Sequence, residues 1–304
     1  MTTRRAWNAR AASGAVAVQE VLTAPTVRST LWKRRWRRFK QNRLSLVGAI
    51  VILLLVLVAI VGPFFAPYPE DARGAVHISD RLRPPSREHL MGTDEVGRDI
   101  LSRLLIGSRL SLGAALVILT MATTIGLTLG MISGFFGGRV DTLVQRLTDV
   151  FLTVPPLILA MAVSAALGPS LINVVWAISL VWWPGYCRLT RAEVLHKKQE
   201  VFVEAARAIG APIHRIILRH VLPNILTPIV VKATMDVGFA VLTLASLGFI
   251  GLGAQPPDPD WGRMIADGRR YFPESWWLTF FPGAAIFLSV FGFNILGDGI
   301  RDVF

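Results

Sequence analysis

Three charged residues, Glu200, Glu204 and Arg207, flank a row of apolar side chains at the spacing of a short amphipathic helix. The apolar positions, which recur at helical spacing and make one face, are Val201, Phe202, Ala205, Ala206 and Ile209. Gly210 then predicts a left-handed stop, and Pro212 prevents the helix from continuing. Because a helix this short is unstable alone in water, we expect its apolar face to dock onto another surface.

A second charge pair, Lys232 and Asp236, stands one helical turn apart inside a strongly apolar stretch. Such a spacing allows the two side chains to neutralise one another near the inner leaflet. Ionisable groups inside a membrane are also the hallmark of proton relays in ion-driven transporters. The sequence favours neutralisation and leaves the role of the pair open.

No arrangement of residues in the sequence indicates catalysis. The chain has no Gly-x4-Gly-Lys-Ser/Thr phosphate-binding loop, no Ser/His/Asp arrangement and no paired carboxylates in a plausible cleft. Cys187 is the only cysteine, which excludes an intrachain disulfide and a cysteine-based metal site, and we expect it to be a small buried apolar side chain. The five histidines show no ligand spacing. We therefore expect no enzymatic activity and no cofactor or metal bound by this chain.

The composition is that of an integral membrane protein. Of the 304 residues 53% are hydrophobic and 17% are charged, and the mean hydropathy is +0.52. An ordinary soluble domain of this size is less apolar and carries more charge. Apolar runs of roughly 20 residues recur, which is the length that crosses the core of a bilayer.

Most of the net charge of +12 lies at the N-terminus. Residues 1–43 hold 11 Lys or Arg and a single acid, Glu20, which leaves +2 for the rest of the chain. The basic residues between Lys33 and Arg43 stand immediately before an apolar run, where the positive-inside rule and anionic lipid headgroups favour such charge. We interpret them as a topology signal and a contact with membrane lipids, not as a nucleic-acid site.

The apolar runs divide the chain into six predicted membrane spans and the segments between them. The spans are 44–62, 109–133, 148–167, 171–189, 225–250 and 277–298. We expect a disordered basic cytoplasmic tail over 1–30, a basic juxtamembrane segment with the first span over 31–62, an extracytoplasmic segment over 63–108, and a core with five transmembrane helices over 109–304 that includes a cytoplasmic loop at 190–224. The fold class is therefore all-α, with six transmembrane helices.

Charge sets the expected orientation of these spans. Segments 63–108 and 251–276 are near balance in charge, whereas the loop 188–219 has seven basic residues and three acids, which predicts that the loop and both termini are cytoplasmic. Within the first polar segment, Thr93–Gly107 has the periodicity of an amphipathic helix. A short link leads into the span at 148–167, which Pro155-Pro156 is expected to bend.

Four glycines recur at intervals of four residues in and after the second span, and they predict one smooth stripe on a helix. They are Gly126, Gly130, Gly134 and Gly138. Lipid provides no hydrophobic drive between helices, so small residues at an interface let backbones pack closely. We expect this stripe to be a helix-packing surface.

The segment that begins at Glu204 resembles the EAA loop of ABC-importer permeases, Glu-Ala-Ala-x3-Gly-x9-Ile-x-Leu-Pro. The matching residues are Glu204, Ala205, Ala206, Gly210, Leu222 and Pro223, while His220 stands where the general pattern has Ile. In that family this loop is the cytoplasmic coupling helix, which sits in a groove of the ATP-hydrolysing subunit. The resemblance therefore implies that residues 201–210 couple this chain to an ATPase.

Other stretches resemble the C-type subunit of the dipeptide/oligopeptide/nickel permease family, over roughly residues 35–304. The matching stretches are 91–94, 97–99, 102–103, 107, 109–112, 137–138, 140–141, 146, 149, 155, 245–253, 256–257, 261–262, 294, 297–299 and 301–302. Details at Gly248-Phe249 and Gln255-Pro256-Pro257 lean toward the dipeptide type. Leu244 stands where some relatives carry Glu, so no role of an acid is carried over to it.

The resemblance implies a type I ABC-importer permease subunit in a bacterial plasma (inner) membrane. Its implied partners are a homologous B-type permease, one or two kinds of ATPase subunit that use ATP and Mg²⁺, and an extracytoplasmic binding lipoprotein or periplasmic protein. Di- and oligopeptides are the expected substrates, with nickel complexes, glutathione and haem as alternatives. An ion-coupled secondary transporter is the remote alternative. The substrate-binding residues are left unassigned.

Overall fold

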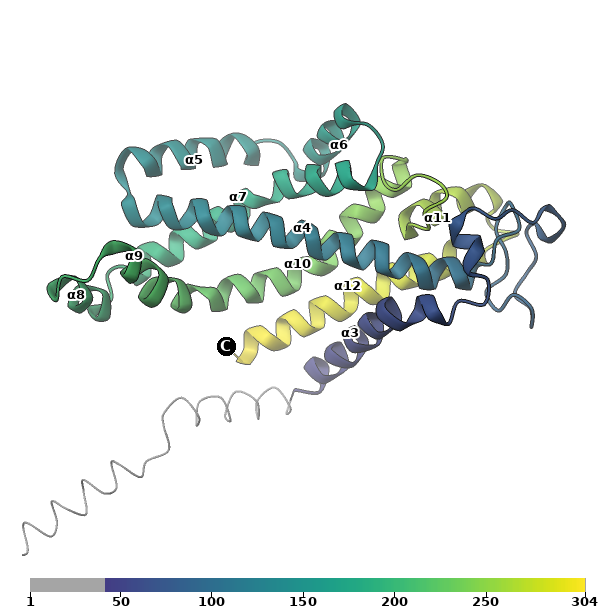
Figure 1. The fold of residues 1–304 in the computed structure, drawn as a ribbon, viewed down its shortest axis with the longest axis horizontal. Coiled ribbons are helices and arrows are strands. Elements are labelled where there is room, and N and C mark those ends of the chain that lie inside the picture. Colours follow the sequence, from purple (N-terminus) through teal and green to yellow (C-terminus); the bar gives the residue numbers. More distant parts are fainter. Residues whose placement is uncertain (1–41, 304) are drawn as a thin grey trace, which may run out of the picture.

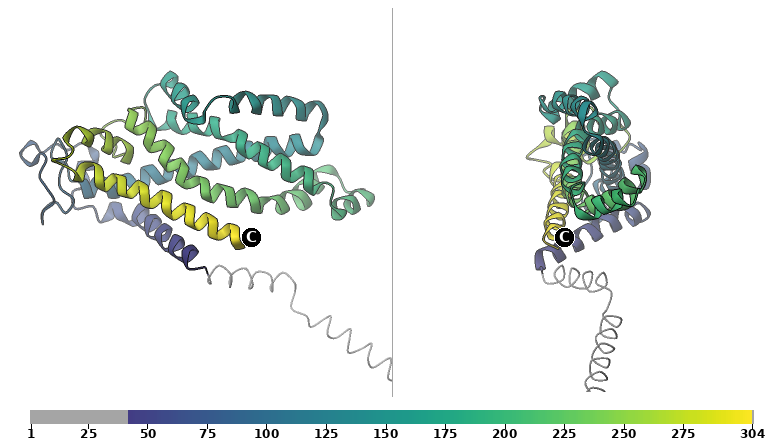
Figure 2. Two further views of the ribbon diagram at one scale, coloured as in Figure 1. Left: turned by 180° about the vertical axis from the view of Figure 1, so that it is seen from behind. Right: turned by 90° about the vertical axis from the view of Figure 1, so that its left-hand side faces the viewer.

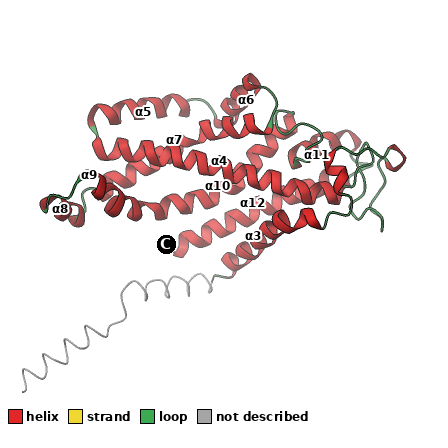
Figure 3. Ribbon diagram, in the orientation of Figure 1, coloured by secondary structure: helices red, strands yellow, loops and turns green. Residues whose placement is uncertain are grey.

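The computed structural model describes residues 42–303, and every regular element in this range is a helix (Figure 3). The one β-type pairing found there is an isolated bridge between Thr93 and Asp99. The all-α fold class is therefore confirmed for this part of the chain. The predicted tail 1–30 and the basic cluster that begins at Lys33, apart from its last residue Arg43, lie outside the described residues.

Five long helices run roughly along one axis of the molecule (Figure 1). They are α3 (Arg43–Val61), α4 (Ile100–Phe136), α7 (Leu171–Lys197), α10 (Leu222–Ile250) and α12 (Trp277–Val303). The shorter helices are α5 (Gly138–Leu152), α6 (Pro156–Leu167), α8 (Val201–Ala208), α9 (Ile213–Arg215) and α11 (Trp261–Gly268). A π-helical turn, Ile216–Val221, joins α9 to α10. Short 3₁₀ turns occupy Gly62–Phe64, Pro69–Arg73, Ile78–Asp80 and Arg269–Tyr271.

Four stretches of helix are long and apolar enough to cross a membrane: Arg43–Phe64, Ile100–Phe136, Ile213–Ile250 and Trp277–Asp302. A fifth crossing is added if α5 and α6, which meet at 87°, count as one broken span. The helix α7 is long enough but is not among them, and many of its side chains are buried against other helices. Within the described residues, length and composition therefore support four or five spans, and six stay a prediction.

The predicted third span, 148–167, is not one continuous helix. Residues 138–152 form the amphipathic helix α5 where a short link was expected, and the chain turns sharply before α6. The break lies where the two prolines predicted a bend: Pro155 has an extended backbone, and Pro156 has no amide hydrogen to extend a helix. Arg191 of α7 binds the carboxylate of Asp141 in α5 through two hydrogen bonds of 2.6 Å, which hold α5 against the bundle.

The predicted helix 93–107 and the predicted span 109–133 are parts of one helix with a different start. Asp99 is the N-cap of α4, and its carboxylate accepts a hydrogen bond from the amide of Ser102 at 2.7 Å. Residues 93–99 are a turn closed by Asp94, which accepts bonds from the amides of Val96 and Arg98. Asp94 would stand in the first turn of the predicted helix 93–107, but in the structure it closes a loop instead.

The helices α3 and α12 lie side by side along one edge of the bundle, in purple and yellow in both views of Figure 2. Glycines allow the contact: a Cβ on Gly48 would lie 2.7 Å from the amide nitrogen of Leu296. The Asn42 side-chain amide donates to the Asp302 carboxylate across 3.3 Å. The beginning of α3 and the end of α12 are thus neighbours.

Candidate functional site

The predicted amphipathic helix exists as α8 and lies at one end of the long axis of the molecule. The segment that joins α3 to α4 lies at the other end (Figure 1). The predicted loop 190–224 is shorter than expected, because α7 continues to Lys197 and α10 already begins at Leu222. Leu222 and Pro223 therefore form the first turn of α10, a position that tolerates proline because its amide needs no helical partner.

One face of α8 packs on the rest of the chain. Val203 and Ala206 are buried, and α8 contacts the π-helical turn, whose Ile216 and Val221 are buried as well. Assigning Ala206 to the free apolar face was therefore wrong: its helical position turns it inward, together with Val203. This inner contact supplies the support that an eight-residue helix lacks on its own.

The opposite face of α8 is apolar and uncovered, and we call it the outer face of α8. It consists of Val201, Phe202, Ala205 and Ile209, with Val201 77% and Ile209 84% exposed. Glu204 is exposed beside this face. A row of exposed apolar side chains on a supported helix is a surface suited to another protein.

The end of α8 is built as the sequence predicts. Gly210 has a φ of 74°, which is the left-handed conformation. Its amide donates to the carbonyl of Arg207 at 2.9 Å, and the amide of Ala211 donates to the carbonyl of Ala206 at 3.0 Å. This pair of bonds is a Schellman motif, which fixes the direction in which the chain leaves α8.

Side-chain contacts tie the α8 region to α4. The Lys198 ammonium, just after α7, donates to the carbonyl oxygen of Gly134 at 2.9 Å. The Arg207 guanidinium of α8 lies 5.8 Å from the ring centroid of Phe135. A force on α8 therefore has a direct route to the end of α4.

Three of the four stripe glycines lie where α4 meets α7. A Cβ on Gly126 would lie 2.6 Å from the carbonyl oxygen of Trp183, one on Gly130 would lie 2.5 Å from that of Cys187, and one on Gly134 would lie 2.9 Å from the Cβ of Val194. Gly138 does not join them. It lies beyond the end of α4, at the start of α5, with a φ of 54° and no heavy atom within 4 Å of a Cβ placed there.

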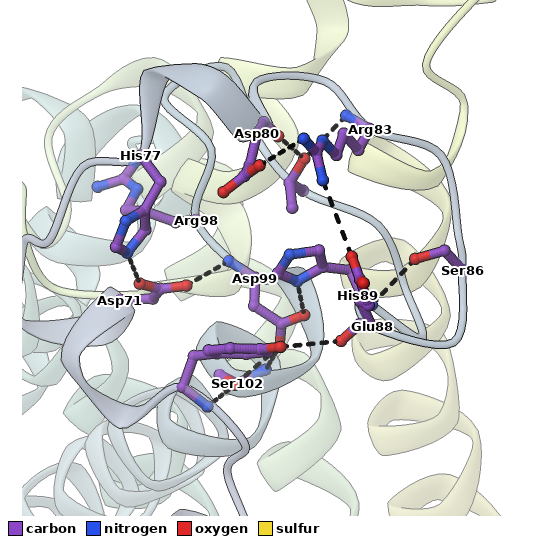
Figure 4. Close-up of polar contacts among 12 residues, drawn as sticks. Asp71, His77, Asp80, Arg83, Ser86, Glu88, His89, Arg98, Asp99 and Ser102 are labelled. Atoms are coloured by element: carbon purple, nitrogen blue, oxygen red, sulfur yellow. Dashed lines mark hydrogen bonds and ion pairs between the residues drawn. The ribbon is translucent and has the colours of Figure 1, made fainter.

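At the other end of the molecule a network of carboxylates and histidines fastens the α3–α4 segment (Figure 4). The carboxylate of Asp71 accepts the amide of Asp99 at 2.7 Å and lies 3.0 Å from the ring of His77. Asp99 in turn contacts the ring of His89 at 3.0 Å and caps α4. This network was not predicted from the sequence, although the Asp-x-x-Ser spacing of Asp99 and Ser102 is that of a helix N-cap.

Comparison with known proteins assigns the family. Residues 126–304 match the family described as binding-protein-dependent transport system inner membrane component. The chain belongs to this permease family. Residues 30–85 match the N-terminal TM domain of oligopeptide transport permease C, which agrees with the resemblance drawn from the motifs.

Curated relatives of this permease are similar over most of its length. The probable D,D-dipeptide transport system permease protein of Escherichia coli (strain K12) is 47% identical over 87% of this chain and 88% of that protein. The dipeptide transport system permease protein of Alkalihalophilus pseudofirmus is 44% identical over 89% and 88%. A glutathione transport system permease protein of Escherichia coli O6:K15:H31 (strain 536 / UPEC) is 40% identical over 97% and 96%.

The fold of the permease is also shared with a solved structure. A chain in an inward-facing structure of the MetNI methionine ABC transporter superposes with a TM-score of 0.52 at 20% identity, over 66% of this chain and 96% of that chain. At this identity the likeness establishes the fold alone. The chain is thus a permease subunit of an ABC importer with the type I fold.

Asp260 is a buried acid in the segment between α10 and α12 of this permease. It is 2% exposed and is the N-cap of α11, where it accepts the amide of Arg263 at 3.2 Å. Burial raises its pKa to about 6, although the bonds from Arg263 and from the hydroxyl of Ser111 act in the opposite direction.

The raised pKa of Asp260 predicts a pH-dependent stability. The stabilisation from the protonated acid is complete below its unfolded pKa of 3.8 and is lost as the pH rises toward the folded pKa of about 6. Asp260→Asn keeps the N-cap and removes the charge, so it should flatten the melting temperature between pH 4 and 6 and raise the unfolding free energy at pH 7 by about 3 kcal/mol. Thermal unfolding of the purified permease across this pH range measures the effect. An unchanged pH profile would contradict the prediction.

Proposed function

We propose that this permease subunit translocates di- and oligopeptides in an ATP-driven importer of a bacterial plasma membrane. Support comes from the relatives, because two proteins with dipeptide transport in their names are 47% and 44% identical to it. Glutathione, a small peptide, is the first alternative substrate, since a glutathione-named permease is 40% identical. Nickel complexes and haem are the further alternatives.

We propose that the outer face of α8 couples the permease to the ATPase, because this face is exposed and apolar. Its apolar side chains are exposed although the helix is anchored on its other side. In our proposal they dock into a groove of an ATPase subunit, together with Glu204 and the turn at Gly210.

The proposed complex contains several further subunits. A homologous B-type permease completes the membrane part, and one or two kinds of ATPase subunit bind ATP and Mg²⁺ on the cytoplasmic side. An extracytoplasmic binding lipoprotein or periplasmic protein delivers the substrate. In this proposal the chain itself binds no cofactor and contacts membrane lipids, but no nucleic acid.

Six crossings with cytoplasmic termini are the proposed topology. They are obtained when α7 and the broken pair α5–α6 are added to the four clear spans. The adjacency of Asn42 and Asp302 supports an even number of crossings.

In a Cys187→Ser background, Lys197→Cys should react with an impermeant maleimide only after the membrane is opened, and labelling in intact cells would refute the orientation.

ATP-driven closure of the ATPases would act on the core through contacts already described. A push on α8 reaches α4 through Lys198 and Phe135, and the glycine contacts make α4 and α7 move together. ATP binding favours one of two arrangements of these packed helices, inward-open or outward-open. The ion-coupled alternative instead needs Lys232 and Asp236 as a proton relay.

Reconstituted uptake tests the proposed function. The complex in liposomes, with its binding protein outside and ATP inside, should accumulate a radiolabelled dipeptide. A pH gradient without ATP should drive none. Uptake of nickel or haem but not of any peptide would move the assignment within the family, and uptake driven by the pH gradient alone would replace it with the ion-coupled class.

A further inference from the structure

A cavity of about 430 Å³ opens between α6, α7 and α10, near the break that separates α5 from α6. Its apolar wall includes Trp182 and Phe239. Its polar wall consists mainly of Tyr186, Lys232 and Asp236. The volume is in the range of pockets that take small molecules.

The polar side chains form a connected group within this cavity. The Lys232 ammonium lies 2.8 Å from the Asp236 carboxylate, which also accepts the hydroxyl of Tyr186 at 2.7 Å. The same ammonium lies 5.2 Å from the centroid of the Tyr186 ring. Asp236 is mostly covered, with 17% of its side chain exposed, whereas 39% of the Lys232 side chain is exposed. The group therefore presents a positioned cation to the cavity.

The depth of the group limits what the cavity can face. Asp236 is the central residue of α10, and Tyr186 lies near the middle of α7. A half-exposed ammonium at this level is costly in hydrocarbon, so such groups face a water-filled path or another protein. Mutual neutralisation explains the pair, but it does not explain why the Lys232 side chain is left partly exposed in a cavity lined by aromatic residues.

Peptides carry the group that complements an accessible ammonium. An α-carboxylate forms a charge-assisted hydrogen bond with an ammonium, and its attraction is strengthened in a partly buried site. The aromatic wall offers apolar contact to a side chain. The charged residues that line this cavity are Lys232, which is the more exposed, and Asp236, which is mostly covered. The cavity therefore suits the anionic end of a peptide better than its cationic end.

We propose that this cavity is a subsite on the translocation path, in which Lys232 binds the C-terminal carboxylate of the passing peptide. Asp236 and Tyr186 are positioning residues that hold the ammonium toward the cavity. Trp182 and Phe239 pack against the last side chain of the peptide. This inference rests on the proposed function and adds the part of the substrate that the membrane subunit recognises.

The test uses the complete complex in liposomes with loaded binding protein and a radiolabelled dipeptide. Lys232→Met should keep ATP hydrolysis stimulated by the binding protein but lower peptide uptake per ATP by about tenfold, the order expected for one lost charge-assisted bond. Lys232→Arg, which keeps the cation, should restore most of the uptake. Arg188→Met is the matched control: it removes an α7 cation that pairs with Asp149 and lies outside the cavity lining, so uptake should persist.

A double variant separates substrate binding from neutralisation. Lys232→Met with Asp236→Leu removes both charges, so a purely structural pair would regain wild-type uptake, and that result would overturn the proposal. We expect the double variant to assemble and to remain defective in uptake. Failure of the double variant to assemble would assign the pair to packing and also overturn it. Absence of ATP-dependent peptide uptake by the wild-type complex would instead refute the proposed function itself.

Discussion

Gly130→Leu is expected to separate α4 from α7 and to abolish recovery of a folded permease. A Cβ at this position would lie 2.5 Å from the carbonyl oxygen of Cys187 and 2.7 Å from the Cβ of Thr190. The first of these atoms is backbone, which cannot rotate away as a flexible side chain can. Overpacking of this kind costs about 3 kcal/mol or more, a large part of the stability of a typical domain.

Gly113→Leu is the matched control for this substitution. It lies in the same helix, and no heavy atom lies within 4 Å of a Cβ placed there. Thermal unfolding and size-exclusion profiles of the two purified variants make the comparison. We expect a monodisperse Gly113→Leu protein and an aggregated or strongly destabilised Gly130→Leu protein. Equal melting temperatures would show that α4 and α7 do not depend on this contact.

The sequence predicted the features that depend on local pattern. The long apolar runs became α3, α10 and α12, because a continuous apolar stretch admits few other structures in a membrane. Gly210 took the left-handed conformation, since only glycine adopts it without strain. The spacing of apolar residues located α8 to within a residue of its observed bounds.

Features that depend on tertiary contact could not be predicted in this way. The stripe from Gly126 was periodic through Gly138, but α4 ends at Phe136, and the last glycine starts another helix. Asp94 has the composition of a first helical turn, yet a buried ion pair with Arg98 at 2.6 Å closes a loop there instead. The helix α5 was missed because its four charged residues make the segment too polar for a membrane span, although its apolar residues recur at helical spacing. One of these charges, Asp141, pairs with a residue 50 positions away.

The polar group in the cavity between α6, α7 and α10 could likewise be predicted only in part from the sequence. The spacing of Lys232 and Asp236 predicted their contact, which the structure confirms at 2.8 Å. The hydroxyl of Tyr186 joins them from another helix, 50 residues earlier in the chain. Pairs on one helix are readable from spacing, whereas a third partner from a neighbouring helix requires the packing to be known.

Disrupting the outer face of α8 is expected to have the second large effect, a nearly complete loss of coupling. Ile209→Asp places a charge at the most exposed apolar position of that face, where docking would desolvate it. Gly210→Val forces a β-branched residue into a left-handed conformation and redirects the chain after α8. Glu204→Lys reverses a charge beside the same face. All three positions are exposed, so we expect the variants to fold and assemble.

Ile213→Asp is the control for these variants. It makes the same change from an exposed apolar side chain to an acid, four residues after Ile209 and outside α8. We expect it to retain most of the coupled activity. A loss as large as that of Ile209→Asp would extend the docking surface beyond the outer face of α8.

The most direct measurement is the ATP hydrolysis rate of the complex in liposomes, with and without peptide-loaded binding protein. Wild-type complex should be stimulated by the loaded binding protein, and Ile209→Asp, Gly210→Val and Glu204→Lys should lose this stimulation together with peptide uptake, while the subunits still purify together. Full stimulation and uptake in all three variants would contradict the account, because the outer face of α8 would then not be the surface that couples this permease to ATP hydrolysis.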